Sequence, residues 1–353
     1  MIRYGDSRSI PELKKLWKEC FADEDAYIDA FFEAMYEDKS VLLEEENGVL
    51  FGASFFLPGK IWLEHTDIPQ NRMPGRQELP KGRTGQDGEW QQIRYVYALA
   101  VYPQYRGRGI AARLLRSAHE IYRSPLIAEP AEDGLVGGFY RPLGFQENFY
   151  LRKKLVELPE YDVQAAEIRS YPDPGKAQRH TGQQLFGEAE PVGQQFTEAE
   201  PVGQQFGEGE PGLSGLSEAA CDPVSAEEYC SIRDQYFQKH GYISWPVRHV
   251  AFAIQQYSSN GGGAFAIRRD GRKDLILYFR EGCKAVVVET TLSQEEAEAW
   301  FLPRMAVRCR QAIFKRMVKP ERSGRASEES FCLTGMSLGL SSVYGYLNLS
   351  LDE

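Results

Sequence analysis

The segment PQYRGRGIAARLL, at positions 103–115, constrains this chain more than any other part of its sequence. It follows strand-forming residues at 93–101 and leads into an apolar helix pattern at 109–122. Gly107 and Gly109 remove side chains where a ligand must approach the backbone closely. The free N–H groups at the start of the helix then form an anion site. The segment therefore predicts a pyrophosphate-binding turn, to which three nearby arginines add positive charge: Arg106, Arg108 and Arg113.

Two classes of ligand carry a pyrophosphate that suits such a turn. One is a dinucleotide, because GRGIAA at 107–112 matches the pattern GxGxxA and Glu129 lies 20 residues beyond Gly109. The context argues against it. In dinucleotide folds the first glycine follows the strand almost directly and the strand–turn–helix unit opens the domain, whereas here residues 103–106 intervene and helices and a hairpin come first. The other class is coenzyme A.

At these residues the chain resembles the GNAT superfamily of N-acetyltransferases. The family's acetyl-CoA motif is Q/R-x-x-G-x-G/A, and QYRGRG at 104–109 fits it. The family's second motif, Tyr-x-x-x-Gly-Phe, is matched by YRPLGF at 140–145, after a short strand at 126–129. The resemblance covers residues 1–158. It implies an α/β (α+β) fold with a mixed, mostly antiparallel sheet flanked by helices.

The resemblance also implies which residues bind acetyl-CoA. The strand end would pair with the pantetheine arm as an added strand, with a backbone N–H near Val101 facing the thioester oxygen. The turn would hold the pyrophosphate. The strand residues are Leu99, Ala100 and Val101, and the turn residues are Gln104, Tyr105, Arg106, Gly107, Arg108, Gly109, Ile110 and Ala111.

Three residues are candidates for proton transfer. Tyr140 is the candidate general acid, because a phenol with a pKa of about 10 suits reprotonation of a thiolate. Its structural alternative is a core aromatic. Glu129, at a strand end, is the candidate base, which would act directly or through water. Its structural alternative is a carboxylate that is simply solvated. Glu353 is a further carboxylate candidate, because in some multi-domain relatives the terminal carboxylate enters the active site. Tyr95 and Tyr97 either line the acceptor site or pack in the core.

The length of 353 residues favours two domains. After the first domain, residues 159–222 form an acidic linker that repeats a ten-residue unit, EAEPVGQQF plus Thr or Gly, at 188–197 and 198–207. Its Glu, Gln, Gly and Pro content predicts disorder. Residues 223–353 form a second, degenerate GNAT-like domain without the glycine turn, which is not expected to bind CoA. This layout is similar to that of the "enhanced intracellular survival" acetyltransferases.

Periodicity and turn residues predict the individual elements. Ser9-Ile-Pro-Glu12 predicts a capping box at the first helix, and Asn47-Gly48 predicts a hairpin turn. The helices are expected at 10–21, 27–36, 109–122, 135–143, 225–236, 246–257 and 293–317. The strands are expected at 40–46, 49–57, 93–101, 126–129, 145–155, 264–269, 274–279, 284–290 and 341–351, with polar loops at 64–92 and 319–330.

Charge and composition exclude several functions. The net charge of −10 does not suit a nucleic-acid-binding protein. No apolar run spans a membrane, the N-terminus shows no secretory signal, and the six cysteines form no CxxC pair, so we expect a cytoplasmic protein with reduced thiols and no metal. The function predicted is transfer of an acetyl group from acetyl-CoA directly to a primary amine of a small molecule or peptide. The second domain would shape the acceptor site or a homodimer interface. The rival is a non-catalytic acyl-CoA-binding regulatory protein.

Overall fold

The described part of the chain builds one continuous sheet. The structure is a computed structural model that describes residues 1–64, 88–158, 220–269, 271–306, 308–318, 330–340 and 347. The strand order is β1-β2-β3-β4-β5-β13-β6-β12-β11-β10-β9-β7, and β8 pairs with β3 beside this path. Among these strands, the pairs β4–β5 and β11–β12 run parallel and the other pairs antiparallel. The predicted fold class is therefore confirmed.

The first half of the chain follows its predicted order. Asn47 and Gly48 have φ angles of 52° and 79°, as the tight turn between β2 and β3 requires. The predicted loop at 64–92 is wrong at its ends, because β3 extends to Glu64 and β4 begins at Gly88, and residues 65–87 lie outside the described residues. The strands are β1 Ile2–Tyr4, β2 Val41–Glu46, β3 Val49–Glu64, β4 Gly88–Val101, β5 Leu126–Ala128 and β6 Gln146–Glu157. The helices are α1 Ile10–Phe21, α2 Asp25–Met35, α3 Ile110–Tyr122 and α4 Asp133–Leu135, the last continued by turns at Val136–Tyr140 and Arg141–Leu143.

The capping box predicted from Ser9 to Glu12 is wrong. Ser9 already has helical angles, φ −80° and ψ −16°, and its side chain makes no capping bond to α1. The box lies one turn earlier, where Asp6 is extended and accepts from the Arg8 N–H at 3.1 Å while the Asp6 N–H donates to Ser9 Oγ. A side chain caps only from a non-helical backbone, and the short 3₁₀ turn at 7–9 moves that position to Asp6.

The second half of the chain departs from prediction at its end. The helix predicted to reach residue 317 ends at Met305, with Pro303 in its last turn, and a strand, β12, follows. Ala312 and Phe314 are buried while their neighbours are half-buried, which is the period-two pattern of a strand. The predicted strand at 341–351 lies outside the described residues apart from Leu347. The elements are β7 Ala220–Pro223, α5 Ala226–Phe237, β8 Ile243–Ser244, α6 Val247–Ser259, β9 Gly263–Arg269, β10 Arg272–Glu281, β11 Lys284–Thr290, α7 Gln294–Met305, β12 Gln311–Val318 and β13 Ser330–Leu338.

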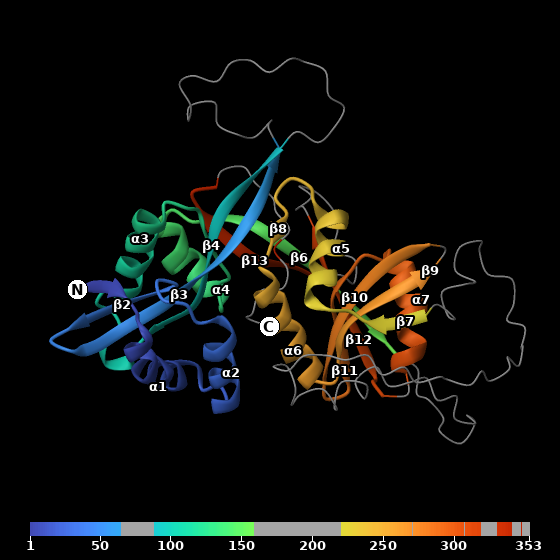
Figure 1. Cartoon of the computed structure of the whole chain (residues 1–353), viewed down its shortest axis with the longest axis horizontal. Helices are drawn as coiled ribbons and strands as arrows, with labels where there is room; N and C mark the ends of the chain where they lie inside the picture. Colours follow the sequence, from blue (N-terminus) through green and yellow to red (C-terminus); the bar gives the residue numbers. More distant parts are fainter. Residues whose placement is uncertain are drawn as a thin grey trace, which may run out of the picture.

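Helices cover both faces of the sheet. On one face, α1, α2, α5 and α6 share a single apolar core, in which Phe31 of α2 contacts Phe252 of α6 with ring centroids 5.8 Å apart. Figure 1 shows α1, α2 and α6 following one another along this side. On the other face, α3 packs over the first half of the sheet and α7 over the second half. Each half therefore repeats one plan, with two helices on one face and one helix on the other.

The two halves exchange their last strands. β13 lies between β5 and β6, while β6 lies between β13 and β12. Figure 1 shows β13 and β6 near the middle of the molecule. The last described strand of the second half, β13, thus pairs with β5 of the first half, and β6 of the first half pairs with β12 of the second half. β8 adds a further link, because Ile243 pairs with Ile61 of β3. The sheet around β5 is therefore complete only when the second half of the chain is present.

A buried ion pair anchors the second half. Arg233 of α5 and Glu289 of β11 are almost fully buried, and Arg233 Nε lies 2.9 Å from Glu289 Oε1. Tyr229 Oη donates to the same carboxylate at 2.6 Å, and Arg233 Nη1 donates to the Ile243 carbonyl oxygen at 2.8 Å. These bonds join α5, β11 and β8, and they satisfy charges that would otherwise be costly to bury.

Replacing Glu289 by Gln should lower the free energy of unfolding by about 3–5 kcal/mol, because it leaves the Arg233 charge buried without its partner. Glu228→Gln is the matched control, since Glu228 and Lys273 form an ion pair at the surface. It should cost at most about 1 kcal/mol. Urea unfolding of both variants measures the difference, and equal losses would contradict this account.

Candidate active site

The candidate site begins where β4 and β5 separate. Their parallel pairing runs from Arg94 with Leu126 to Val96 with Ala128 and stops there, although β4 continues to Val101. At this point β4 is irregular, because its register against β3 shifts and Ala98 has a φ of 49°. Such a bulge bends a strand and ends its pairing. The pairing of the two strands therefore ends at Val96 and Ala128, and we call this point the β4–β5 gap.

The end of β4 offers backbone hydrogen bonds on the side of this gap. The Tyr102 N–H donates to the Phe51 carbonyl oxygen, 3.0 Å away. Because antiparallel pairing alternates, the polar groups of the preceding residue, Val101, point away from β3. The Val101 carbonyl oxygen accepts there from Arg106 Nε at 3.1 Å and from the Cys20 thiol. Burial raises the pKa of that thiol, so Cys20 stays protonated as a donor.

The glycine turn leads from this strand end into α3. Gly107 and Gly109 have φ angles of 76° and 72°, in the left-handed region that glycine adopts without strain. Gly109 is the N-cap of α3 and has no side chain to occupy the first N–H groups of the helix. The exposed turn and these donors form a place for an anion. The first turn of α3 contains no acidic residue.

The arginines of the turn divide into two roles. The sequence predicts that Arg113 adds positive charge beside the turn, but in the structure it forms an ion pair with Glu44 of β2 at 2.6 Å. Its Nη1 also donates to the Arg108 carbonyl oxygen at 2.7 Å, so it braces the turn. Arg106 and Arg108 are exposed, and the Arg108 guanidinium lies 5.3 Å from the centre of the Tyr105 ring. These two cations therefore supply the positive charge of the turn.

The equivalent helix of the second half shows the opposite arrangement. α7 also follows a parallel strand, but Ser293 caps it and forms a capping box with Glu296. Ser293 Oγ accepts from the Glu296 N–H, and Glu296 accepts from the Ser293 N–H in return. Two acidic residues, Glu295 and Glu296, occupy the first turn. This helix start satisfies its own donors, and its acidic residues disfavour an anion there.

Tyr140 lies in the apolar core beneath α3. It ends a π-helical turn and is only 6% exposed. Its ring contacts Phe139 and Phe145 with centroids 5.0 and 5.2 Å away. The same core contains Val96 and Ala128, the last residues that pair β4 with β5. The structure therefore places Tyr140 in the core that also contains the last paired residues of β4 and β5, and its catalytic role stays a prediction.

The carboxylate candidates differ in what the structure shows. Glu129 follows β5 directly, is half-buried, and accepts from Thr334 Oγ1 of β13 at 2.9 Å. Glu353 lies outside the described residues. Tyr95 and Tyr97 are buried in the core on the other face, where Tyr97 Oη lies 2.7 Å from Tyr27 Oη. The sequence missed Thr334 and Glu44, because no local pattern connects either residue with the site.

The dinucleotide alternative does not fit this fold. A dinucleotide fold uses an open, mostly parallel sheet and a free carboxylate at the end of the second strand for the ribose. Here the described sheet is mostly antiparallel, and the corresponding carboxylate, Glu129, is bonded to β13. The strand–turn–helix match is therefore local only.

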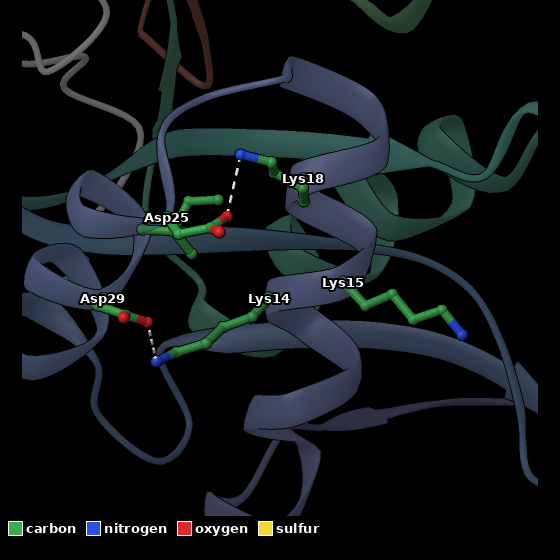
Figure 2. A pocket seen from close by; sticks show the side chains of 6 residues that line it. Lys14, Lys15, Lys18, Asp25 and Asp29 are labelled. Carbon is green, nitrogen blue, oxygen red and sulfur yellow. Dashed lines mark hydrogen bonds and ion pairs between the residues drawn. The ribbon is translucent and has the colours of Figure 1, made fainter.

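A surface depression of about 340 Å³ lies between α1 and α2, away from these residues. Figure 2 shows that its lysines are largely paired: Lys14 with Asp29 at 2.6 Å and Lys18 with Asp25 at 2.9 Å, while Lys15 points outward. None of the predicted site residues lines it. In the described ranges, no group of three or more His, Cys, Asp or Glu side chains could hold a metal ion. The same ranges contain no helix long and apolar enough to cross a membrane.

Comparison with known proteins gives a partial family match and several structures of similar fold. Residues 79–147 match the family model described as an acetyltransferase (GNAT) domain, and no curated protein matches the chain. Similar solved structures include a probable N-acyltransferase of unknown function from Enterococcus faecalis V583, at 10% identity and a TM-score of 0.58, covering 96% of this chain and 71% of that one. Another is a GCN5-related N-acetyltransferase from Anabaena variabilis, at 13% identity and a TM-score of 0.58, covering 96% and 72%. A third is Eis1 from Mycobacterium abscessus, at 10% identity and a TM-score of 0.54, covering 96% and 73%.

The structural likenesses, at such low identity, establish the fold over nearly the whole chain. The family match spans the strand end, the glycine turn and α3 that form the candidate site. The GNAT resemblance read from the sequence is therefore confirmed. Residues 79–147 match the GNAT acetyltransferase domain, and the described structure has the fold of solved N-acetyltransferases over nearly the whole chain.

Replacing Gly107 by Ala should cost about 1 kcal/mol of folding free energy, because the left-handed φ strains any residue with a Cβ. A Cβ there would meet nothing within 4 Å, so the loss reports backbone strain alone. Gly137→Ala is the matched control, since a Cβ there also meets nothing and its backbone is helical. It should be neutral or stabilising by up to about 1 kcal/mol. Denaturant midpoints compare the two, and an equal effect at both positions would refute the strain argument.

Proposed function

We propose that this protein transfers an acetyl group from acetyl-CoA directly to a primary amine of a small molecule or peptide. One observation carries the proposal: β4 continues beyond its pairing with β5 and leads through the glycine turn into a helix start that no side chain caps. An extended ligand with amide groups at one end and a pyrophosphate at the other would meet matching partners along this path. Pantetheine pyrophosphate has that chemistry.

The residues that would hold acetyl-CoA fit it by their chemistry. Leu99, Ala100 and Val101 would pair with the amides of the pantetheine arm, as an added strand pairs with a sheet edge. The turn from Gln104 to Ala111 would bind the pyrophosphate through its backbone N–H groups and its two exposed arginines. The absence of side chains at its glycines leaves the backbone within reach of the phosphates.

Acetyl-CoA supplies an acetyl group activated as a thioester. The chain's own groups would then handle charge and protons. Glu129 would take a proton from the acceptor ammonium so that the neutral amine forms the new C–N bond. The Val101 N–H would stabilise negative charge on the carbonyl oxygen. As the C–S bond breaks, Tyr140 would give its proton to the sulfur and recover one from the nitrogen, so that one proton leaves to solvent overall.

The acceptor class follows from charge. The chain has a net charge of −10, which favours encounter with cationic molecules. A polyamine, an aminoglycoside, or a Lys or N-terminal amine of a peptide has the required primary amine. All six cysteines are free thiols, which supports a cytoplasmic setting for the reaction. The second half of the chain would shape the acceptor site or a homodimer interface.

The coenzyme is tested by calorimetric titration with acetyl-CoA, with NADH as the control ligand. We expect micromolar binding of acetyl-CoA alone, and Gly109→Glu should abolish it, because the new side chain strains the turn and adds a negative charge at the anion site. Arg116→Glu is the matched control, since it makes a larger charge change at an exposed position of the same helix. If the wild-type protein did not bind acetyl-CoA, the proposal would be rejected. Binding without CoA release for any amine would favour the non-catalytic acyl-CoA-binding alternative.

The role of Tyr140 is tested by Tyr140→Phe, which keeps the ring and removes the hydroxyl. The turnover number should fall by about 10²–10⁴-fold with unchanged affinity for acetyl-CoA, because a general acid contributes about that factor. Tyr122→Phe is the control, since Tyr122 packs against the same core and its hydroxyl donates only to the Lys39 carbonyl oxygen among the bonds described. Release of CoA can be followed with a thiol reagent. Full activity of Tyr140→Phe would remove Tyr140 from the mechanism.

A further inference from the structure

The contact between Glu129 and Thr334 joins residues 205 positions apart in the sequence. Glu129 comes directly after Ala128, the last residue of β5 to pair with β4. Thr334 belongs to β13, the strand that the second half of the chain inserts beside β5. The candidate base at the gap is therefore held by the half of the molecule that lacks the glycine turn.

An irregularity in β13 aims Thr334 at this carboxylate. Met336 pairs with Ala128, so continuing that antiparallel register would place Gly335 opposite Glu129. On its other side, β13 changes register against β6 around Gly335, and Thr334 has no Cα partner there. A bulge of this kind redirects the side chain beside it. Thr334 thus reaches Glu129 Oε1 at 2.9 Å.

Packing fixes the irregularity in place. A Cβ on Gly335 would lie 2.5 Å from Leu347 Cδ2 and 3.0 Å from Phe149 Cδ2, so no other residue fits without displacing them. Met336 and Ser337 beyond it are fully buried. The position of the Thr334 hydroxyl is therefore set by the core rather than by solvent, which is the requirement for a group that orients another.

We propose that Thr334 is a positioning residue, which holds the Glu129 carboxylate in the orientation that receives the proton of the acceptor amine. The inference rests on the proposed function. It assigns the second half of the chain a direct part in the reaction, through one side chain of its exchanged strand. A hydroxyl that donates to a carboxylate also favours the charged form, which is the form able to accept a proton.

The test compares Thr334→Val with Thr334→Ser in the full chain. Valine keeps the shape and loses the donor, so kcat should fall about ten-fold, the effect of losing one hydrogen bond to a charged group. The KM for acetyl-CoA should not change, because the turn and the β4 edge are untouched. Serine keeps the hydroxyl and should restore most of the activity. Ser337→Ala is the control, since it removes another β13 hydroxyl, one bonded to Asn148, and should leave kcat unchanged.

A double-mutant cycle separates positioning from stability. In a Glu129→Ala background, Thr334→Val should cause no further loss of kcat, because the group that it positions is gone. The inference would be overturned if Thr334→Val lowered kcat by the same factor with and without Glu129, or if Thr334→Val were fully active. Either result would leave the proposed function intact. A wild type that binds acetyl-CoA but acetylates no amine would instead reject the proposed function, and this inference with it.

Discussion

The separation of β4 from β5 is the constraint on which the rest of this structure depends. Pairing in the sheet would satisfy the backbone of both strands, yet the bulge at Ala98 ends it after Val96. β4 then continues to Val101 beyond its pairing with β5, and the Val101 carbonyl oxygen accepts from Arg106 and Cys20 on the side away from β3. The glycine turn follows at once, so strand edge and helix start line a single path. A regular β4 would close this path with ordinary ladder bonds.

The exchange of last strands explains why the two halves work as one sheet. Without β13, the short strand β5 would keep only β4 as a partner, over three residue pairs. With it, β5 is paired on both sides and the sheet runs unbroken into the second half. The same insertion brings Thr334 to Glu129. The stability of the sheet and the geometry of the candidate site therefore both depend on β13. Dividing the chain at residue 158 would separate β13 from β5 and from Glu129.

The sequence predicts what depends on neighbours along the chain. The turn at 103–115, the Asn47-Gly48 hairpin and most helices follow from local spacing, and the structure has them. Errors arise where distant contacts decide. Residues 311–318 continue an apparent helix pattern, but pairing with β6 and β11 makes them a strand. No local sequence pattern predicts the Glu44–Arg113 ion pair or the Thr334 contact, because each joins residues more than sixty positions apart. The same holds for the bulge at Ala98, which is defined by the register of β4 against β3.

The two halves also show how little of the site belongs to the fold itself. Each half places a helix after a parallel strand, so each inherits the same helix dipole and the same uncommitted N–H groups. In α7 the side chains of Ser293 and Glu296 form a capping box. In α3 the N-cap is Gly109, which has no side chain to cap the helix, and exposed arginines lie in the turn before it. The dipole alone makes both helix starts attractive to anions. The residues at the cap decide which one keeps that property: the start of α3 stays free of a side-chain cap, whereas the start of α7 is closed by its own residues.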